Sequence, residues 1–436
     1  MKGFTIYKSL TYLALLTLLV GCSSAGTTSR SNGEPPSAFV PENSFSVPGQ
    51  LTASDLVYSV LLHRSGNRQS APIIELDTNQ TLLLSFDLLE RDSRQLKVTF
   101  THHNPDWTRS GLDQSFYQDG FLNQNLDFGN VSNSQHPGFR NYQFEFPNRD
   151  VSFLVSGNYM LRVEDVDTGN FLFSMPFFVT ENEGAISSSV DTRTTPRSED
   201  MRTAHYPRST FELPDFVDTP QFDLEFYYVQ NQFWGRNREA QELDTSAPGE
   251  VLFEMRQESP FVGDYEFQFL SLNNLSLQAP QIADYDPTTI PPKVVLFEDA
   301  QGFSSDLSRL SGRQFGNPSQ NLSAQYADVH FTFDPAQNYS PQTEIYLVGD
   351  FNNWSIQSNY GLSYNEQTNR WTTNGIIKEG TYSYKYVLMQ NNRIVDLALD
   401  DTFTRTEQEY HAFVYFRDPD RFYYRLLQIN QFFGRS

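Results

Sequence analysis

Two adjacent histidines, His102 and His103, are the residues whose type most readily suggests metal chemistry. Neutral imidazole is a common metal ligand, but neighbouring side chains of a β-strand point to opposite faces. On a strand, this pair therefore cannot hold one ion together. On a loop it could, and His136 would then have to fold back to complete the ligand set. We predict no metal site and no cofactor.

The motifs that usually carry catalysis do not occur in the 436 residues. We find no G-x-S-x-G nucleophile elbow, no P-loop and no H-E-x-x-H helix. The 53 Asp and Glu residues would allow a carboxylate pair of the kind that glycosidases use, but nothing in the sequence singles out two of them. The sequence therefore names no catalytic residue.

Cys22 is the only cysteine, and its position suggests a covalent modification. It ends the run Leu19-Val20-Gly21-Cys22, behind two lysines and the apolar stretch Leu10–Val20. This stretch is too short for a lasting transmembrane helix and is typical of a signal peptide. Its end resembles the lipobox of bacterial lipoproteins. We predict that residues 1–21 are removed and that Cys22 becomes the acylated N-terminus; a plain secretory signal is the alternative.

Lipidation of Cys22 would leave no free thiol, which excludes disulfides, zinc–thiolate sites and cysteine nucleophiles. The formal net charge is −22, and loss of the two signal-peptide lysines would make it −24. So acidic a protein does not bind nucleic acid by counterion release. General surface acidity, as in halophiles, explains the charge as well as any acidic functional face does.

Residues 22–50 are rich in Ser, Thr, Gly and Pro, with a few scattered apolar side chains such as Phe39, Val40 and Phe45. We predict a flexible tether, whose root-mean-square reach is about 30 Å. Such a tether would let a folded body stand clear of the lipid surface.

The remaining sequence has the period-two pattern of β-strands. Leu82, Leu84 and Phe86 share one face of an expected strand, and the same alternation continues through the run 96–100. Aromatic residues make up 15% of the chain, which suits strands packed face to face. We see no convincing amphipathic helix. The expected fold is all-β, with tandem antiparallel β-sandwiches of immunoglobulin-like type.

Shifts in composition divide the body into consecutive parts. We expect an N-terminal sandwich over 51–182, a middle β domain over 206–323 and a C-terminal sandwich over 324–430. The Ser- and Thr-rich stretch 183–205 is expected to be a linker or long loop.

The clearest local motif lies in the C-terminal part. Glu344–Trp354 reads EIYLVGDFNNW, with a strand followed by a turn at Gly349-Asp350, and Gly380–Val387 alternates strictly. This pairing resembles the early-set immunoglobulin-like domains, which include glycogen-binding modules. The resemblance implies that Trp354 could stack on a sugar ring and that Lys385 could bind its hydroxyls. The second stacking Trp of those modules is replaced here by Arg393. A structural role for Trp354, as a cap on the core, is therefore the stronger expectation.

Four short sequence motifs follow one another along the N-terminal part. They are Leu84–Asp87 (LSFD), His102–Trp107 (HHNPDW), Phe116–Phe121 (FYQDGF) and Ser156–Leu161 (SGNYML). Together with the GDFNNW segment, they resemble the Plug family of the type IX secretion system of Bacteroidota, from about Tyr58 to Tyr424.

Two positions depart from the family's pattern. The family often has His-Cys where this chain has His102-His103, and an acidic–alanine pair where it has Asn104-Pro105. The middle segment matches least well.

This resemblance implies a binding protein and not an enzyme. Its partner would be the outer-membrane β-barrel translocon, whose periplasmic mouth the folded body would block, and no small-molecule substrate is expected. Candidate contact residues are Trp107 with Tyr117 and the loops around Trp234 and Trp354, although core packing is the alternative for each. A second hypothesis is an α-glucan-binding lipoprotein that uses Trp354 and Lys385.

The residues after Cys22 bear on the compartment. Ser23-Ser24 lack the aspartate that retains enterobacterial lipoproteins in the inner membrane, and no acidic run of the kind associated with surface export follows. We therefore expect a lipid anchor in the outer membrane and a body on its periplasmic face, with the cell surface as the alternative.

Overall fold

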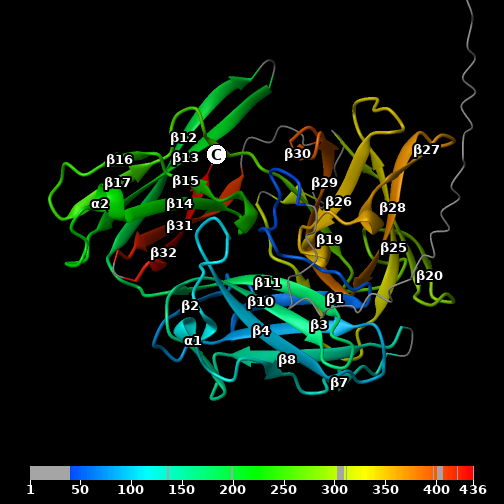
Figure 1. The fold of residues 1–436 in the computed structure, drawn as a ribbon. Coiled ribbons are helices and arrows are strands. Elements are labelled where there is room, and N and C mark those ends of the chain that lie inside the picture. The colour runs from blue at the N-terminus through cyan, green and yellow to red at the C-terminus, as the bar shows by residue number, and fades with distance from the viewer. Residues whose placement is uncertain are drawn as a thin grey trace, which may run out of the picture. The chain divides into compact units, whose positions relative to one another are not determined.

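The computed structural model describes residues 40–134, 137–197, 200–301, 309–310, 312–395, 397–399, 406–419 and 421–435. Cys22, the signal segment, the first part of the tether and His136 lie outside these ranges. The prediction of a mostly β fold is confirmed (Figure 1). The two α-helices that the described residues form have four residues each, α1 (Gln114–Tyr117) and α2 (Pro220–Asp223). In the described ranges, no helix is long and apolar enough to cross a membrane.

The first sandwich packs two sheets around one apolar core. Leu82, Leu84 and Phe86 are fully buried, as the alternation predicted. One sheet has the order β1 (Val57–Arg64), β3 (Leu82–Leu88), β8 (Arg140–Phe146), β7 (Asn130–Val131). The other has the order β2 (Ile73–Glu75), β11 (Phe171–Thr180), β10 (Gly157–Asp165), β4 (Leu96–His103), β6 (Gln124–Asn125). A small ribbon of β5 (Gln118–Gly120) and β9 (Val151–Phe153) adjoins α1.

The second sandwich joins strands from two distant parts of the chain. Its core includes Phe226 stacked on Phe253 at 3.9 Å between ring centroids. One sheet has the order β12 (Ile186–Arg197), β13 (Asp200–Glu212), β17 (Glu250–Glu254), β16 (Glu242–Asp244), with β18 (Phe261–Val262) also on β13. The other has the order β15 (Arg238–Glu239), β14 (Leu224–Gln230), β31 (Glu407–Arg417), β32 (Tyr424–Arg435). In Figure 1, the red strands β31 and β32 lie beside the green β14.

The third sandwich contains the GDFNNW segment. One sheet has the order β23 (Arg309–Leu310), β19 (Phe267–Ser271), β29 (Gly380–Gln390), β24 (Asn317–Pro318), with β26 (Glu344–Gly349) and β30 (Arg393–Val395) also on β29. The other has the order β20 (Ile282–Asp286), β21 (Lys293–Leu296), β25 (Tyr326–Asp334), β28 (Arg370–Lys378), β27 (Ser363–Asn365), with β22 (Asp299–Ala300) on β25. Most pairings are antiparallel; β2 with β11, and β21 and β22 with β25, are parallel.

The stretch 183–205 is not the linker that we expected. It forms β12 and the first part of β13, paired from Ile186–Phe211 to Arg197–Asp200. Its Ser and Thr residues suggested a loop because they are polar. Thr is β-branched, however, and fits an extended strand whose outer face meets water.

The boundary between the middle and C-terminal parts also differs from the expectation. Strands β31 and β32, which we assigned to the C-terminal sandwich, complete the second one, whereas β19–β24 belong to the third. The chain therefore runs from the second sandwich into the third and then back into the second. Composition along the sequence cannot reveal this, because β14 and β31 pair across about 180 intervening residues.

The last part of the predicted tether is packed. Phe45 and Val47 are 2% and 0% exposed, and each belongs to a different buried apolar cluster. These side chains stand apart in a polar segment, so they form no periodic pattern. The described chain therefore joins the folded body well before residue 50.

Candidate functional site

The three sandwiches meet along three buried seams. We name them by the sandwiches that they join: the first–third, first–second and second–third seams. The aromatic side chains singled out in the sequence, Trp107, Trp234 and Trp354, all lie in these seams and are 6%, 7% and 4% exposed. Their surroundings decide what they can do.

The first–third seam is ionic. Asp87 of β3 accepts hydrogen bonds from Lys378 Nζ and Tyr326 Oη, both at 2.6 Å, and from Asn141 Nδ2 at 2.7 Å. Lys378 Nζ also lies 4.2 Å from the ring centroid of Phe139. Burial, with the neighbouring carboxylate of Asp87, raises the pKa of Tyr326 well above its usual value. The seam thus buries a charge pair whose oxygens all have donors.

The first–second seam is aromatic. Phe178 of β11 packs against Trp107 at 5.6 Å and against Trp234 at 4.9 Å between centroids. Tyr415 Oη donates to Asn158 Oδ1 at 2.7 Å across the same seam. The contact fixes the first sandwich on the sheet that holds β14 and β31.

The second–third seam is closed by the N-terminal segment. Phe45 packs against Phe233 at 4.6 Å and against Trp354 at 5.5 Å between centroids. The guanidinium of Arg236 also lies over Phe45, 3.6 Å from its ring centroid. This single side chain, from a segment that looked like tether, connects the second and third sandwiches.

The predicted sugar platform is absent at Trp354. Its indole is buried in the second–third seam, and its Nε1 donates to Asp350 Oδ1 at 2.9 Å. Lys385 is 2% exposed, with its Nζ 4.1 Å from the ring centroid of Tyr265. Neither side chain can reach a polysaccharide at the surface, and the burial of Trp354 agrees with the structural role that was the stronger expectation.

The other predicted contact pair is buried as well. Tyr117 is 6% exposed and donates from Oη to the carbonyl of Phe100 at 3.1 Å, while Trp107 lies in the first–second seam. The two residues therefore stabilise the first sandwich and its seam. Neither presents a free aromatic face to a partner.

The GDFNNW segment is a compact local structure. Asp350–Asn352 form a 3-10 turn, and Asn352 Oδ1 accepts from the amide of Gly349 at 2.9 Å. Asn353 and Trp354 follow with φ of 51° and 58°. Asn tolerates this left-handed region, whereas a Trp there costs about 1–3 kcal/mol that the surrounding packing must offset.

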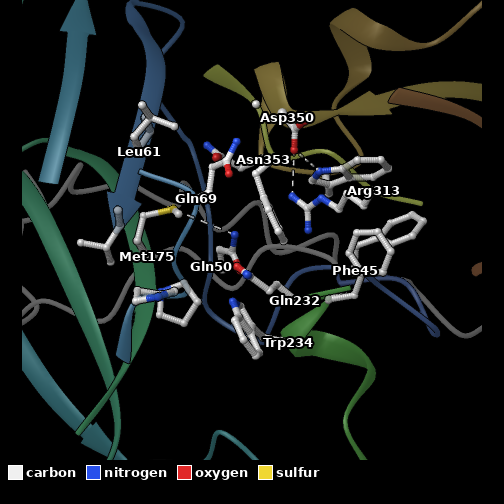
Figure 2. Close-up of a pocket in the computed structure, with 18 of the residues that line it drawn as sticks. Phe45, Gln50, Leu61, Gln69, Met175, Gln232, Trp234, Arg313, Asp350 and Asn353 are labelled. Atoms are coloured by element: carbon white, nitrogen blue, oxygen red, sulfur yellow. Dashed lines mark hydrogen bonds and ion pairs between the residues drawn. The ribbon is translucent and has the colours of Figure 1, made fainter. Parts of the chain in front are cut away.

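A pocket opens where the three sandwiches and the N-terminal segment meet; we call it the junction pocket. Its volume is about 120 Å³. Figure 2 shows its wall, to which all three sandwiches contribute. The labelled residues that best show this mixed origin are Leu61 and Met175 from the first sandwich, Gln232 and Trp234 from the second, Asp350 and Asn353 from the third, and Phe45 and Gln50 from the N-terminal segment.

The charged groups of the junction pocket are Arg68, Arg313 and Asp350. Arg313 Nη2 donates to Asp350 Oδ1 at 2.8 Å, and its guanidinium lies 5.0 Å from the ring of Phe233 and 4.9 Å from that of Trp354. Arg68 Nη1 donates to Asn317 Oδ1 at 2.8 Å. Burial lowers the pKa of Arg68 from its ordinary value. Two guanidiniums against one carboxylate leave the pocket with an excess positive charge.

The two adjacent histidines lie on β4, with alternating burial as predicted for a strand. His102 Nε2 pairs with the carbonyl of Ser156 at 3.0 Å, and His103 Nδ1 with that of Trp107 at 2.8 Å. Burial lowers the pKa of His102 to about 4. In the described ranges, no group of three or more His, Cys, Asp or Glu residues could hold a metal ion.

Sequence reasoning missed Phe45 as a packing residue and missed Arg68 and Arg313 altogether. Only Asp350 carried a signal, as part of the turn in the GDFNNW segment. Its oxygens accept from Trp354 Nε1, Arg313 Nη2 and the amide of Ser383, the last at 2.7 Å. The motif therefore organises the wall of the junction pocket.

Comparison with known proteins identifies the first sandwich. Residues 57–181 match the family described as type 9 secretion system plug protein, first domain. For these residues, the match confirms the resemblance predicted from the sequence. The second and third sandwiches lie outside the matched range.

A solved structure extends the likeness to the whole fold. A crystal structure of a hypothetical protein from Parabacteroides merdae ATCC 43184 matches with a TM-score of 0.76 and 21% identity, over 91% of this chain and 99% of that chain. At this identity the likeness establishes the fold alone. No curated protein matches the chain.

Two other solved structures are too dissimilar to support any argument. Escherichia coli alpha-2-macroglobulin has a TM-score of 0.18 and 9% identity, over 88% of this chain and 26% of that chain. The C-terminal domain of the Streptococcus pyogenes protein AspA has a TM-score of 0.14 and 8% identity, over 85% of this chain and 98% of that chain.

Proposed function

We propose that this chain is a non-enzymatic lipoprotein that closes the periplasmic mouth of the type IX secretion barrel in the outer membrane. The observation that carries the proposal is the match of residues 57–181 to the plug-protein first domain. The lipobox-like run at Cys22 supports the anchor, and the short segment before the packed Phe45 would keep the body close to the membrane.

The mechanism that we propose is steric. A stopper must keep its shape against a channel, whereas domains joined only by linkers move relative to one another. The seams support a stiff body, because opening the first–third seam would separate Asp87 from Lys378, and a buried charge without its partner is strongly destabilising. The two aromatic seams add close packing around Phe45 and Phe178.

The surface that would touch the barrel must come from exposed side chains, because the tryptophans are buried. The first sandwich exposes Phe116, Phe121, Leu122 and Leu154 by 64%, 67%, 51% and 50%. They are held together: Leu154 N donates to the carbonyl of Tyr117, which follows Phe116, and Gln114 Nε2 donates to the carbonyl of Leu122. We propose this group, which we call the α1 patch, as the contact with the translocon.

Purification from gently solubilised membranes tests the proposal. We expect a very large outer-membrane barrel to accompany the parent chain, and deletion of the gene to make the membrane leaky to small polar compounds. Phe116→Ser with Phe121→Ser should abolish co-purification. Phe222→Ser, on a side chain that is 76% exposed in the second sandwich, is the matched control and should not.

Two results would count against the proposal. Purification of the parent chain alone, with an intact barrier in the deletion strain, would overturn the plug function. Retention of the barrel by the Phe116 and Phe121 double variant would overturn the contact surface only.

A further inference from the structure

We propose that the junction pocket binds a carboxylate carried on a short apolar stem, as a glutamate side chain or a peptide C-terminus presents it. This inference stands apart from the plug function, since it rests on the donors, charge and shape of the pocket. It holds whether or not the body closes a channel.

The pocket has more hydrogen-bond donors than acceptors. Arg313 Nε and Arg68 Nη2 are buried and have no hydrogen-bond partner in the described structure. Gln50 Nε2 reaches only the thioether sulfur of Met175, at 4.0 Å, which is a weak acceptor. Three donors with little or no compensation therefore belong to side chains that line the pocket, and a buried donor without an acceptor is costly. A carboxylate supplies two acceptor oxygens at once.

The charge of the pocket also favours a carboxylate ligand. Asp350 is the one acidic residue that lines it, and its two oxygens already accept from Trp354, Arg313 and Ser383. Arg68 forms no ion pair among the described residues, and its one hydrogen bond is to a neutral amide. An unneutralised guanidinium in a chain with a net charge of −22 selects for an anionic ligand.

Some of the backbone strain of the chain also occurs at this pocket. Gln232, Asn353 and Trp354 line the pocket and have φ of 55°, 51° and 58°. For side chains such as Gln and Trp, this conformation costs about 1–3 kcal/mol each. Strain of this kind persists where the surrounding structure holds a site in a required shape. The three residues come from two sandwiches, so no single turn explains them.

The size of the pocket limits the ligand. A cavity of about 120 Å³ is slightly smaller than the ~150 Å³ cavity that accepts benzene in another protein. It holds a carboxylate and a few methylene groups, and no folded domain or oligosaccharide. Phe45, Leu61 and Met175 supply apolar surface beside the guanidiniums, which suits an aliphatic stem better than a fully hydrated ion such as phosphate.

Calorimetric titration of the purified mature chain in detergent tests the proposal with four probes. They are acetyl-Gly-Gly-Val with a free C-terminus, the same peptide as its amide, acetyl-Gly-Glu-Gly amide, and inorganic phosphate. We expect binding of the free-terminus peptide, the glutamate peptide or both, and none of the valine amide. Which acid binds identifies the source of the carboxylate.

Variants then place the binding in the pocket. Arg68→Gln should weaken it about tenfold or more, because a charged donor is lost. Gln50→Met keeps the length of the side chain, removes the amide donor and should weaken binding about threefold. Arg149→Gln changes a side chain that is 91% exposed and outside the pocket, and should leave binding unchanged. Thermal unfolding of each variant checks that it folds.

The inference is overturned by any of four results. They are equal binding of the acid and amide peptides, tighter binding of phosphate than of either acid, no binding of either acid at millimolar concentrations, or an unchanged affinity in a folded Arg68→Gln variant.

Discussion

The seam that holds the third sandwich to the first and the seam that holds it to the second use opposite chemistry. The first–third seam buries the pair Asp87–Lys378 and surrounds it with hydrogen bonds. The second–third seam buries Phe45 and Trp354 among other rings, and cations such as Arg236 and Arg313 lie against these rings.

The two seams differ in the hydrogen-bonding capacity that they leave unused. Both oxygens of the Asp87 carboxylate accept hydrogen bonds from within the chain. The ionic seam therefore has a structural role. The aromatic seam is held mainly by ring packing, and Arg313 at this seam and Arg68 in the adjoining junction pocket retain donors without partners among the described residues. A ligand site is compatible with the second arrangement and not with the first.

Acid should have the largest effect, through histidines that are kept neutral by burial. Burial lowers the pKa of His102 and His205 to about 4 and that of His411 to about 3. His411 lies 5.2 Å from Trp234, in an aromatic seam. Below pH 6.5 the unfolded chain takes up protons that the folded chain refuses. The contribution of each neutral histidine to the free energy of unfolding is therefore complete above pH 6.5. It is lost as the pH falls toward 4, by up to about 1.4 kcal/mol per pH unit for each histidine.

Urea unfolding at pH 7.5, 6 and 5 measures this loss. His411→Gln should reduce the pH dependence of the free energy of unfolding by the contribution of one histidine, the one that lies in the aromatic seam. His330→Gln is the control, since its ring lies near the surface and pairs with Asn374. Equal pH dependence in all three proteins would mean that His411 does not limit the aromatic seam.

Removal of one partner from the ionic seam should have the next largest effect. Lys378→Met leaves the carboxylate of Asp87 buried without a cation, which costs about 3–5 kcal/mol. The double variant with Asp87→Leu should recover much of the loss, because no isolated charge remains. Arg208→Gln, in a pair with Glu254 whose side chains are 40% and 39% exposed, should cost at most about 1 kcal/mol. Chemical denaturation compares the three, and a loss of similar size for Lys378 and Arg208 would remove the distinction between the seams.

A covalent link should strengthen the aromatic seam by a smaller amount. Ser46 Oγ and Ser355 Oγ lie 3.1 Å apart and join the N-terminal segment to the third sandwich. With both changed to Cys and oxidised, they close a loop of about 300 residues, which should stabilise the chain by about 2–4 kcal/mol. Ser188 and Ser209, whose Oγ atoms are 2.8 Å apart within one hairpin, give the matched control pair.

The control pair closes a much shorter loop and should add less stability. Thermal unfolding with and without reductant measures both links. If the Ser46–Ser355 link gives no gain while the control link does, the N-terminal segment is not a working part of the aromatic seam.

The sequence could predict strands because alternation is local. The buried faces of β3 and β4 follow from it, and so does the burial of Phe86. It could not predict that β31 pairs with β14, because the preference for one partner strand over another lies in side-chain packing far away along the chain.

The candidate site was beyond local reasoning for the same reason. The sequence favoured a core cap over a sugar platform for Trp354, but it could not identify what covers the ring, because Phe45 comes from the distant N-terminal segment. Arg68 and Arg313 have no motif at all. They become neighbours of one pocket only when the sandwiches are assembled.

The smallest predicted effect concerns the turn that presents Trp354 to the aromatic seam. Asn353 has φ of 51° and Asn391, in the exposed turn between β29 and β30, has φ of 49°. Replacement of either by Ala should cost about 1 kcal/mol, whereas Gly should cost less, because Gly has no Cβ to clash in the left-handed region. The stability change should therefore be similar at the two sites. Only Asn353→Ala should also alter tryptophan fluorescence, since it moves the neighbour of Trp354. A fluorescence change of the same size in Asn391→Ala would show that the signal does not report on the seam.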